Sequence, residues 1–230
     1  MPMKLHLTYL LWSVIFVSGY PVILPAQEAA QKHLPEAFHG MHQDPEAYIA
    51  MLENPQRDRE QKPDEVIKAL NLNDGDRVAD IGAGSGYFSV RFAHAVGADG
   101  RVFAVDTSPD MVLHMNRRIR DLKLANMIAV LSAPDDPLLS DNSIDLFFIC
   151  NTWHHIQNRD HYLALMKKIL RPGGRIAMVD YLKKALPVGP PPQMKIARED
   201  LIREMESGGF GLTEEHSFLP YQYFLIFKPK

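Results

Sequence analysis

Short apolar runs alternate with amphipathic stretches along most of the chain. Five of these runs predict β-strands, at residues 77–81, 101–105, 127–131, 144–150 and 175–179. The stretches between them repeat apolar positions at helical spacing and predict helices, at residues 64–70, 87–96, 109–122 and 159–170. Strands that alternate with helices of this length are typical of a parallel, doubly wound α/β sheet.

The C-terminal part of the chain departs from this alternation. After a proline-rich loop at residues 187–192, a helix is expected at 198–208, followed by two strand-like runs at 212–217 and 221–228. The short connection between these runs predicts an antiparallel hairpin at the sheet edge. The expected fold class is therefore α/β, with a Rossmann-like, seven-stranded, mostly parallel sheet and an antiparallel C-terminal hairpin strand. Nothing divides residues 64–230, so they are expected to form one domain.

Two connections carry strong turn signals. Residues 133–143 are rich in proline and aspartate and predict an irregular loop. Arg171-Pro172-Gly173-Gly174 predicts a tight turn between the helix that precedes it and the last parallel strand.

The first 26 residues form a segment of their own. Lys4 precedes a largely apolar stretch at residues 5–24, no acidic residue occurs before Glu28, and Ala26 follows Pro25 as a small residue at a plausible cleavage point. This pattern predicts a signal peptide or a membrane anchor, and the sequence leaves both open. In either case the body of the protein is expected to be exported, periplasmic or secreted, or anchored to a membrane through its N-terminus.

Residues 27–63 are polar, with one short helix expected near 45–52. Their position ahead of the domain makes them a possible lid, with Tyr48 or Gln61 closing the site. His33, His39 and His42 lie in this segment, but no acidic pattern completes a metal site, so a solvated linker is the favoured interpretation and no metal is predicted.

Composition narrows the function classes. The net charge of −3 argues against a nucleic-acid partner, because phosphate-binding domains usually carry a basic excess. Arg117, Arg118 and Arg120 are accordingly predicted to lie on a solvated helix face. The single cysteine, Cys150, excludes an intramolecular disulfide and a cysteine-based zinc cluster, and its apolar surroundings in the sequence predict a core position.

The first predicted strand ends in an acidic residue and a glycine-rich turn, with Asp80 followed by Gly82, Gly84 and Gly86. The spacing G-x-G-x-G differs from the G-x-G-x-x-G of dinucleotide sites. A carboxylate at Asp80 suits a cationic amino group better than a pyrophosphate. The turn therefore favours an amino-acid-bearing methyl donor over a dinucleotide, with an ordinary strand-to-helix turn as the structural alternative.

Several motifs in order make the chain, from about residue 60 to 230, resemble the class I S-adenosylmethionine-dependent methyltransferases. The resemblance is to the small-molecule branch of methyltransferase type 11/25, which includes ubiquinone and arsenite methyltransferase-like proteins. It rests on the following segments: the glycine turn at 78–86, Asp106, the fourth strand at 145–151, and the L-x-P-G-G turn at 170–174. Arg57-Asp58, residues 61–63 and residues 218–227 also resemble an exported bacterial methyltransferase-like subgroup.

The resemblance implies a cofactor, S-adenosylmethionine, and roles for individual residues. Asp80 would orient the methionine amino group, the three glycines would pack against the donor, and Asp106 would bind both ribose hydroxyls. Where the family often has an aspartate before alanine, this chain has Ser132-Ala133, so adenine recognition is expected to shift to Asp135 or to backbone. The expected cofactor-binding residues are Asp80, Gly82, Ala83, Gly84, Gly86, Tyr87, Asp106, Thr107, Ser132, Ala133 and Asn151.

The predicted reaction is methyl transfer to a small-molecule acceptor by in-line displacement, for which alignment matters more than any fixed catalytic residue. If the acceptor must lose a proton, His154 or His155 is the first candidate base and Asp180 the second, since both sites follow predicted strands. Two other functions stay open: an exported, non-catalytic binding protein that keeps the fold and, less favoured, a nicotinamide-dependent oxidoreductase.

Overall fold

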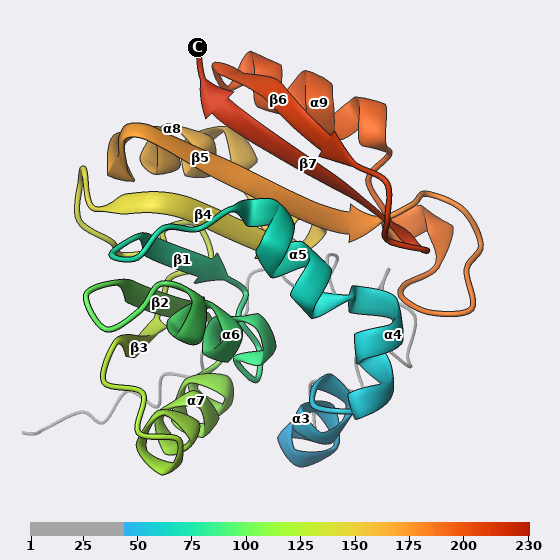
Figure 1. The fold of residues 1–230 in the computed structure, drawn as a ribbon. Helices are drawn as coiled ribbons and strands as arrows, with labels where there is room; N and C mark the ends of the chain where they lie inside the picture. Colours follow the sequence, from blue (N-terminus) through green and yellow to red (C-terminus); the bar gives the residue numbers. More distant parts are fainter. Residues whose placement is uncertain (1–43) are drawn as a thin grey trace, which may run out of the picture. The chain divides into compact units, whose positions relative to one another are not determined.

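The computed structural model describes residues 44–230, and its centre is a single seven-stranded sheet (Figure 1). The strands are β1 (Arg77–Ile81), β2 (Arg101–Asp106), β3 (Met127–Leu131), β4 (Ile144–Cys150), β5 (Leu170–Tyr181), β6 (Phe210–His216) and β7 (Gln222–Pro229). Their order across the sheet is β3-β2-β1-β4-β5-β7-β6. The first five pair in parallel, whereas β7 is antiparallel to both β5 and β6, which confirms the predicted fold class and the hairpin at the sheet edge.

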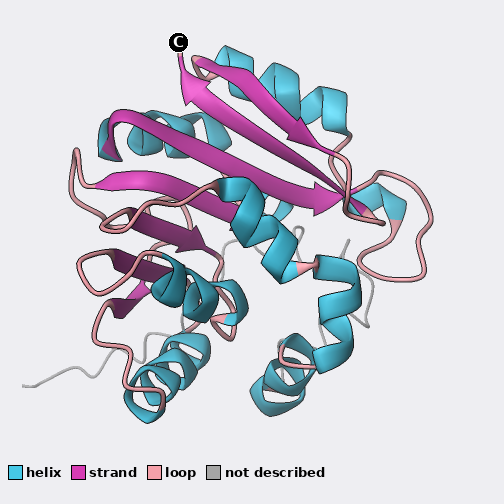
Figure 2. Cartoon of the chain, in the orientation of Figure 1, coloured by secondary structure: helices cyan, strands magenta, loops and turns pink. Residues whose placement is uncertain are grey.

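Helices cover both faces of this sheet (Figure 2). They are α5 (Pro63–Leu70), α6 (Tyr87–Ala95), α7 (Pro109–Asp121), α8 (Arg159–Ile169) and α9 (Arg198–Ser207). Side chains of α5, α6 and α7 pack in one apolar cluster, and those of α8 and α9 pack in a second. Successive residues of a strand point to opposite faces, so Val78 of β1 belongs to the first cluster and Ala79 to the second.

Local sequence signals account for where helices begin. The side chain of Ser108 accepts a hydrogen bond from the Met111 backbone N–H at 3.4 Å, and Pro109 occupies the first helical position of α7. Such a cap satisfies an N–H that has no partner within the helix. The start of α7 therefore follows from the adjacent Ser108 and Pro109, which are visible in the sequence.

The predicted turn at residues 171–174 lies within β5 rather than before it, and the strand begins at Leu170 instead of Arg175. Leu170 pairs with Ile144 and Arg175 pairs with Leu146, so four residues of β5 bulge out opposite a single residue of β4. Gly173 has φ +83° within this bulge, a conformation that favours glycine. The turn residues thus interrupt the ladder without ending the strand.

The segment before the sheet contains α3 (Pro45–Leu52), a short 3-10 turn at Pro55–Arg57, and α4 (Asp58–Gln61). The helix at 45–52 was expected, and α4 was not. α3 has no buried residue, and Gln61 is the one buried residue of α4. None of the helices in the described part of the chain is both long and apolar enough to cross a lipid bilayer. The predicted leader and His33, His39 and His42 lie outside the described residues.

Candidate active site

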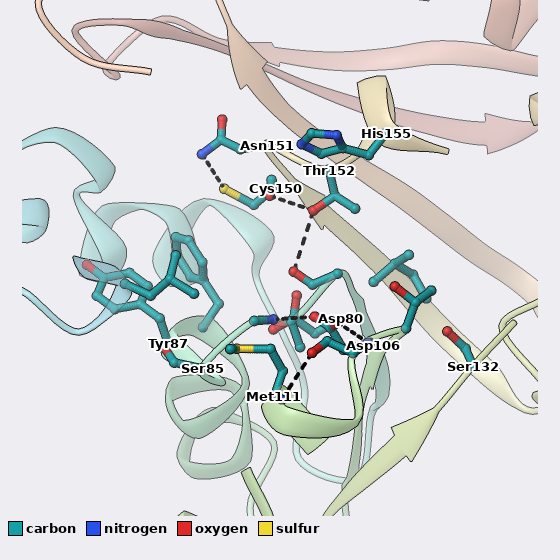
Figure 3. A pocket seen from close by; sticks show the side chains of 18 of the residues that line it. Asp80, Ser85, Tyr87, Asp106, Met111, Ser132, Cys150, Asn151, Thr152 and His155 are labelled. Atoms are coloured by element: carbon teal, nitrogen blue, oxygen red, sulfur yellow. Dashed lines mark hydrogen bonds between the residues drawn. The ribbon is translucent and has the colours of Figure 1, made fainter. Parts of the chain in front are cut away.

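A cavity of about 390 Å³ lies at the carboxyl ends of β1, β2, β3 and β4 (Figure 3). The strand order reverses between β1 and β4, and in open α/β sheets ligands bind at this point. Most of the predicted cofactor residues line the cavity: Asp80, Gly82, Ala83, Gly84, Tyr87, Asp106, Thr107, Ser132, Ala133 and Asn151. Gly86 is the exception among them.

The glycine turn after β1 is shaped by close packing. Gly82, Gly84 and Gly86 all have positive φ, at +68°, +56° and +79°. A Cβ on Gly82 would lie 2.3 Å from the side chain of Thr152, and one on Gly84 would lie 2.9 Å from Leu52. Gly86 instead faces Met115 of α7, so it shapes the start of the helix and does not line the cavity. These positions require glycine because a Cβ would be both strained and crowded.

Asp106 is held at the end of β2 by backbone N–H groups. One carboxylate oxygen accepts from the Gly84 N–H at 2.8 Å, and the other accepts from the Ser108 N–H at 2.9 Å. The carboxylate therefore connects the glycine turn to the start of α7. Ser108, not Asp106, provides the N-cap of α7, so the helix does not account for the acid at this position.

Asp80 is a buried carboxylate at the base of the cavity, with 3% of its surface exposed. Its pKa is raised to about 7, chiefly because the group is buried; the hydroxyl of Ser89, which donates to Asp80 at 2.5 Å, lowers the pKa, and the charge of Asp106 raises it. A cationic ligand group beside Asp80 would favour its ionised form, because an opposite charge lowers the pKa of a carboxyl group.

The loop after β3 contributes Ser132, Ala133 and Pro134 to the wall. Asp135 is exposed and does not line the cavity, so of the two expected routes of adenine recognition, Asp135 or backbone, the lining favours the backbone. Tyr162 of α8 lines the cavity near this loop, and sequence reasoning missed it because it falls on an apolar helix position that reads as core.

The segment formed by residues 45–61 covers the cavity, with Tyr48, Leu52 and Arg57 in its lining. We call this segment the lid. Glu53 accepts from His114 at 2.7 Å and from Arg118 at 2.9 Å. These contacts join the lid to α7.

Arg118 also connects α7 to the glycine turn. It donates to the backbone carbonyl of Ser85 at 2.9 Å, in addition to its ion pair with Glu53. The prediction that Arg118 lies on a solvated helix face was therefore wrong. Ion pairing across elements that are distant in the sequence has no local sequence signal.

Tyr87, the first residue of α6, provides a second attachment for the lid. Its hydroxyl donates to Asp58, and its ring lies 4.6 Å from the Arg57 guanidinium and 4.2 Å from that of Arg91. Burial and the bond to Asp58 raise the pKa of Tyr87 well above its usual value. Arg91 in turn pairs with Asp58 at 3.3 Å. Tyr87 thus joins the glycine turn to α4 while it lines the cavity.

The end of β4 forms the opposite wall, with Cys150, Asn151, Thr152 and His155 together on that side in Figure 3. Cys150 is half-buried and lines the cavity, so its predicted core position is only partly correct. Burial raises the pKa of its thiol above the range in which a thiolate forms. Cys150 is therefore a neutral, weakly hydrogen-bonding group here.

A set of side-chain amides lies directly behind this wall. Gln222 of β7 donates to Asn151 at 2.9 Å and to Gln61 at 3.3 Å, and the Cys150 thiol lies 3.5 Å from the same Gln61 oxygen. Gln61 and Gln222 are buried and do not line the cavity. Gln61 therefore anchors the lid in the body of the protein rather than closing the site directly.

The three candidate bases occupy different positions. Nδ1 of His154 lies 3.1 Å from a carboxylate oxygen of Asp180, and the two side chains are 6% and 2% exposed. Neither of them lines the cavity, whereas His155 does. The His154 and His155 rings are 4.1 Å apart. Among the described residues, no group of three or more potential ligands is arranged to hold a metal ion.

Comparison with known proteins agrees with this geometry. A family described as a methyltransferase domain matches residues 72–210, more than half of the 230 residues. The chain is 28% identical over 117 residues to a ubiquinone/menaquinone biosynthesis C-methyltransferase of Psychromonas ingrahamii, and 30% identical over 119 residues to that of Cellvibrio japonicus. These alignments cover 50% and 51% of this chain and 47% and 48% of the relatives, so the chain spans about half of their length.

Solved structures extend the likeness over most of the chain. The crystal structure of an S-adenosylmethionine-dependent methyltransferase from Aquifex aeolicus matches with a TM-score of 0.76 and 26% identity, over 80% of this chain and 97% of that one. The PH0226 protein of Pyrococcus horikoshii matches in fold, with a TM-score of 0.61 and 16% identity over 77% and 92% of the two chains. The chain therefore belongs to the class I S-adenosylmethionine-dependent methyltransferases, and S-adenosylmethionine is its cofactor.

Proposed function

We propose that the protein methylates a small-molecule acceptor that approaches from the carboxyl ends of β4 and β5. The observation that carries this proposal is that Asp80, Asp106 and His155 line one cavity from opposite sides (Figure 3). When bound, S-adenosylmethionine supplies an electrophilic methyl group whose bond to a cationic sulfur breaks as the acceptor attacks.

The residues present fit this cofactor. Asp106 is oriented by two backbone N–H groups, and a carboxylate suits a pair of ribose hydroxyls because it only accepts hydrogen bonds. Asp80 is buried with a pKa of about 7 and suits the donor's ammonium group. Gly82 and Gly84 have no room for a Cβ, so the backbone of the turn can approach the donor closely. Ser132 and Ala133 line the cavity and are the proposed contacts of the adenine.

His155 is the proposed base. It lines the cavity, and an imidazole can accept a proton near neutral pH when the acceptor is a hydroxyl, an amine or a carbon acid. His154 packs against its ring and is itself held by Asp180, so we assign these two residues to positioning. The C-methyltransferase names of the curated relatives support a carbon acceptor as the first to test.

A binding experiment with the full chain tests the donor site. Calorimetry with S-adenosylhomocysteine, the demethylated product, should show binding in the micromolar range, and NADH should not compete. Absence of binding at millimolar concentration would instead support a non-catalytic protein that keeps the fold. Incubating the protein and methyl-labelled S-adenosylmethionine with an extract of the source organism should then transfer label to a small molecule.

We also propose that residues 1–26 export the protein or anchor it to a membrane. The proposal rests on the apolar stretch at 5–24 behind Lys4. Fractionation of cells that express the full chain should recover it outside the cytoplasm or in the membrane fraction, and the mass of the purified protein should show whether the first 26 residues are removed. Recovery of the intact chain in the cytoplasm would contradict export.

A further inference from the structure

Arg57 is a cation in the cavity lining that has no carboxylate partner among residues 44–230. It is the one lysine or arginine among the described residues that line the cavity. Other arginines near the lid form ion pairs, Arg91 with Asp58 and Arg118 with Glu53. No ion pair among the described residues includes Arg57. A half-buried guanidinium without a counter-charge is costly unless a ligand provides one.

The contacts of Arg57 hold its charge beside the methionine end of the proposed donor site. The guanidinium donates to the Leu52 carbonyl and lies over the Tyr87 ring at 4.6 Å. Tyr87 directly follows the glycine turn, so the guanidinium over its ring lies next to this turn, and both Arg57 and Asp80 line the same cavity. The charge of Arg57 also lowers the pKa of Cys150 against the effect of burial, so it acts at the end of β4 as well.

The lid that carries Arg57 is lightly packed. None of the residues of α3 is buried, and α4 buries Gln61 alone. Its attachments are polar: Glu53 to α7, Asp58 to Tyr87, and Gln61 to Gln222. Segments with few buried apolar contacts open at low free-energy cost, so one further ion pair can change how often the lid is closed.

We propose that Arg57 binds the carboxylate of an amino-acid-bearing ligand in this cavity and that this contact fastens the lid over the bound ligand. The inference rests on the proposed function and extends it. Asp80 of β1 would bind the ammonium group of the ligand, and Arg57 of the lid would bind its carboxylate. A planar guanidinium suits a carboxylate because it can donate two parallel hydrogen bonds.

Two ligands that differ in this group test the proposal by calorimetry on the full chain. S-adenosylhomocysteine has the amino-acid group, and 5′-methylthioadenosine has the same nucleoside thioether without it. Arg57→Gln should weaken the binding of S-adenosylhomocysteine by roughly 10- to 100-fold, the effect of losing a hydrogen-bonded charge pair. The affinity for methylthioadenosine should stay within about twofold of its value in the unaltered protein. Arg57→Lys should recover part of the loss.

Arg59→Gln is the matched control, because Arg59 is an exposed arginine two residues further on, in α4, outside the cavity. It should change neither affinity. Equal weakening of both ligands by Arg57→Gln would indicate a structural role, and no weakening of either would assign the charge to the acceptor. Both results would overturn the proposal. If neither ligand binds the unaltered protein, the proposed donor site is wrong, and the inference about Arg57 is wrong as well.

Hydrogen exchange gives a readout for the lid. S-adenosylhomocysteine should slow exchange of backbone amides in residues 45–61 in the unaltered protein, and methylthioadenosine should slow it much less. In Arg57→Gln at saturating S-adenosylhomocysteine the extra protection should be absent. Equal protection by the two ligands would overturn the link between the carboxylate and lid closure.

Discussion

The side-chain amide of Gln222 donates a hydrogen bond to the side-chain oxygen of Asn151 at 2.9 Å and so connects β7 to the wall of the cavity. The same amide reaches Gln61 in the lid at 3.3 Å. Three elements that are far apart in the sequence therefore meet at one buried amide. The other Gln222 side-chain atom, Oε1, is buried and has no partner among the described residues.

Gln222→Leu should lower the free energy of unfolding by about 1–3 kcal/mol. The substitution leaves the Asn151 oxygen without the Gln222 donor and the Gln61 oxygen with only the weak Cys150 thiol, and an unpaired buried acceptor costs that amount. Chemical denaturation measures the change. Gln193→Leu, the same substitution at an exposed position, should remain within about 0.5 kcal/mol of the unaltered protein.

Asp106→Asn should weaken S-adenosylhomocysteine binding by about 1–3 kcal/mol, since the carboxylate that would accept from the ribose hydroxyls loses its charge. Asparagine keeps one oxygen for one of the two backbone N–H donors, Gly84 or Ser108, so the fold should survive. Calorimetry, with a circular dichroism spectrum of the variant, separates the two effects. An unaltered affinity would locate the ribose elsewhere.

The affinity for S-adenosylhomocysteine should decrease as the pH falls below about 7. The donor's ammonium group favours ionised Asp80, whereas burial holds the pKa of free Asp80 near 7, so binding at lower pH must release a proton. Because one proton is released, the affinity should change by at most roughly tenfold per pH unit. Calorimetry between pH 5.5 and 8, in buffers of different ionisation enthalpy, counts the protons.

Asp80→Asn should bind S-adenosylhomocysteine more weakly than the unaltered protein at pH 8, and its affinity should lose most of the pH dependence. The substitution should also change how the free energy of unfolding depends on pH. The folded pKa of Asp80 lies above its value of 3.8 in a model peptide, so the folded state binds more protons and the unfolding free energy declines as pH rises from about 4 to 7. The asparagine variant should lack this part of the decline, and identical pH profiles would contradict the assigned burial effect.

Gly82→Ala should be more destabilising than Gly75→Ala. Both glycines have positive φ, at +68° and +89°, but a Cβ on Gly82 meets Thr152 at 2.3 Å whereas one on Gly75 meets nothing within 4 Å. Gly75→Ala therefore measures backbone strain alone, about 1 kcal/mol or somewhat more. The clash should add roughly 1–3 kcal/mol at Gly82. Thermal unfolding of the two variants gives the difference.

His155→Gln should reduce turnover by roughly 10²- to 10⁴-fold once an acceptor is known, the usual contribution of a general base. Binding of S-adenosylhomocysteine should stay unaltered. His154→Gln should have a smaller effect on turnover, because His154 acts through the orientation of its neighbour. Full activity of both variants would leave alignment of the two substrates as the main catalytic device.

The sequence alone determined the fold class and the position of the cofactor turn. Alternating apolar runs, the Ser108-Pro109 helix start and the glycine spacing are local signals, and each acts through residues a few positions apart. Local signals also explain the largest error in a strand boundary, the start of β5. A Pro-Gly-Gly run marks a break in the backbone pattern, but only pairing with β4 decides whether the strand resumes after it.

Only the tertiary structure decided which side chains share the cavity. His154 and His155 are adjacent in sequence, yet one is buried against Asp180 and the other lines the site, because the short 3-10 turn after β4 directs them differently. Arg57 and the Gln61–Gln222 contact had no periodic signal that revealed their roles, since their partners come from elements brought together by the sheet order. Charge pairing and buried amide bonds depend on distance in space, and a sequence pattern records only distance along the chain.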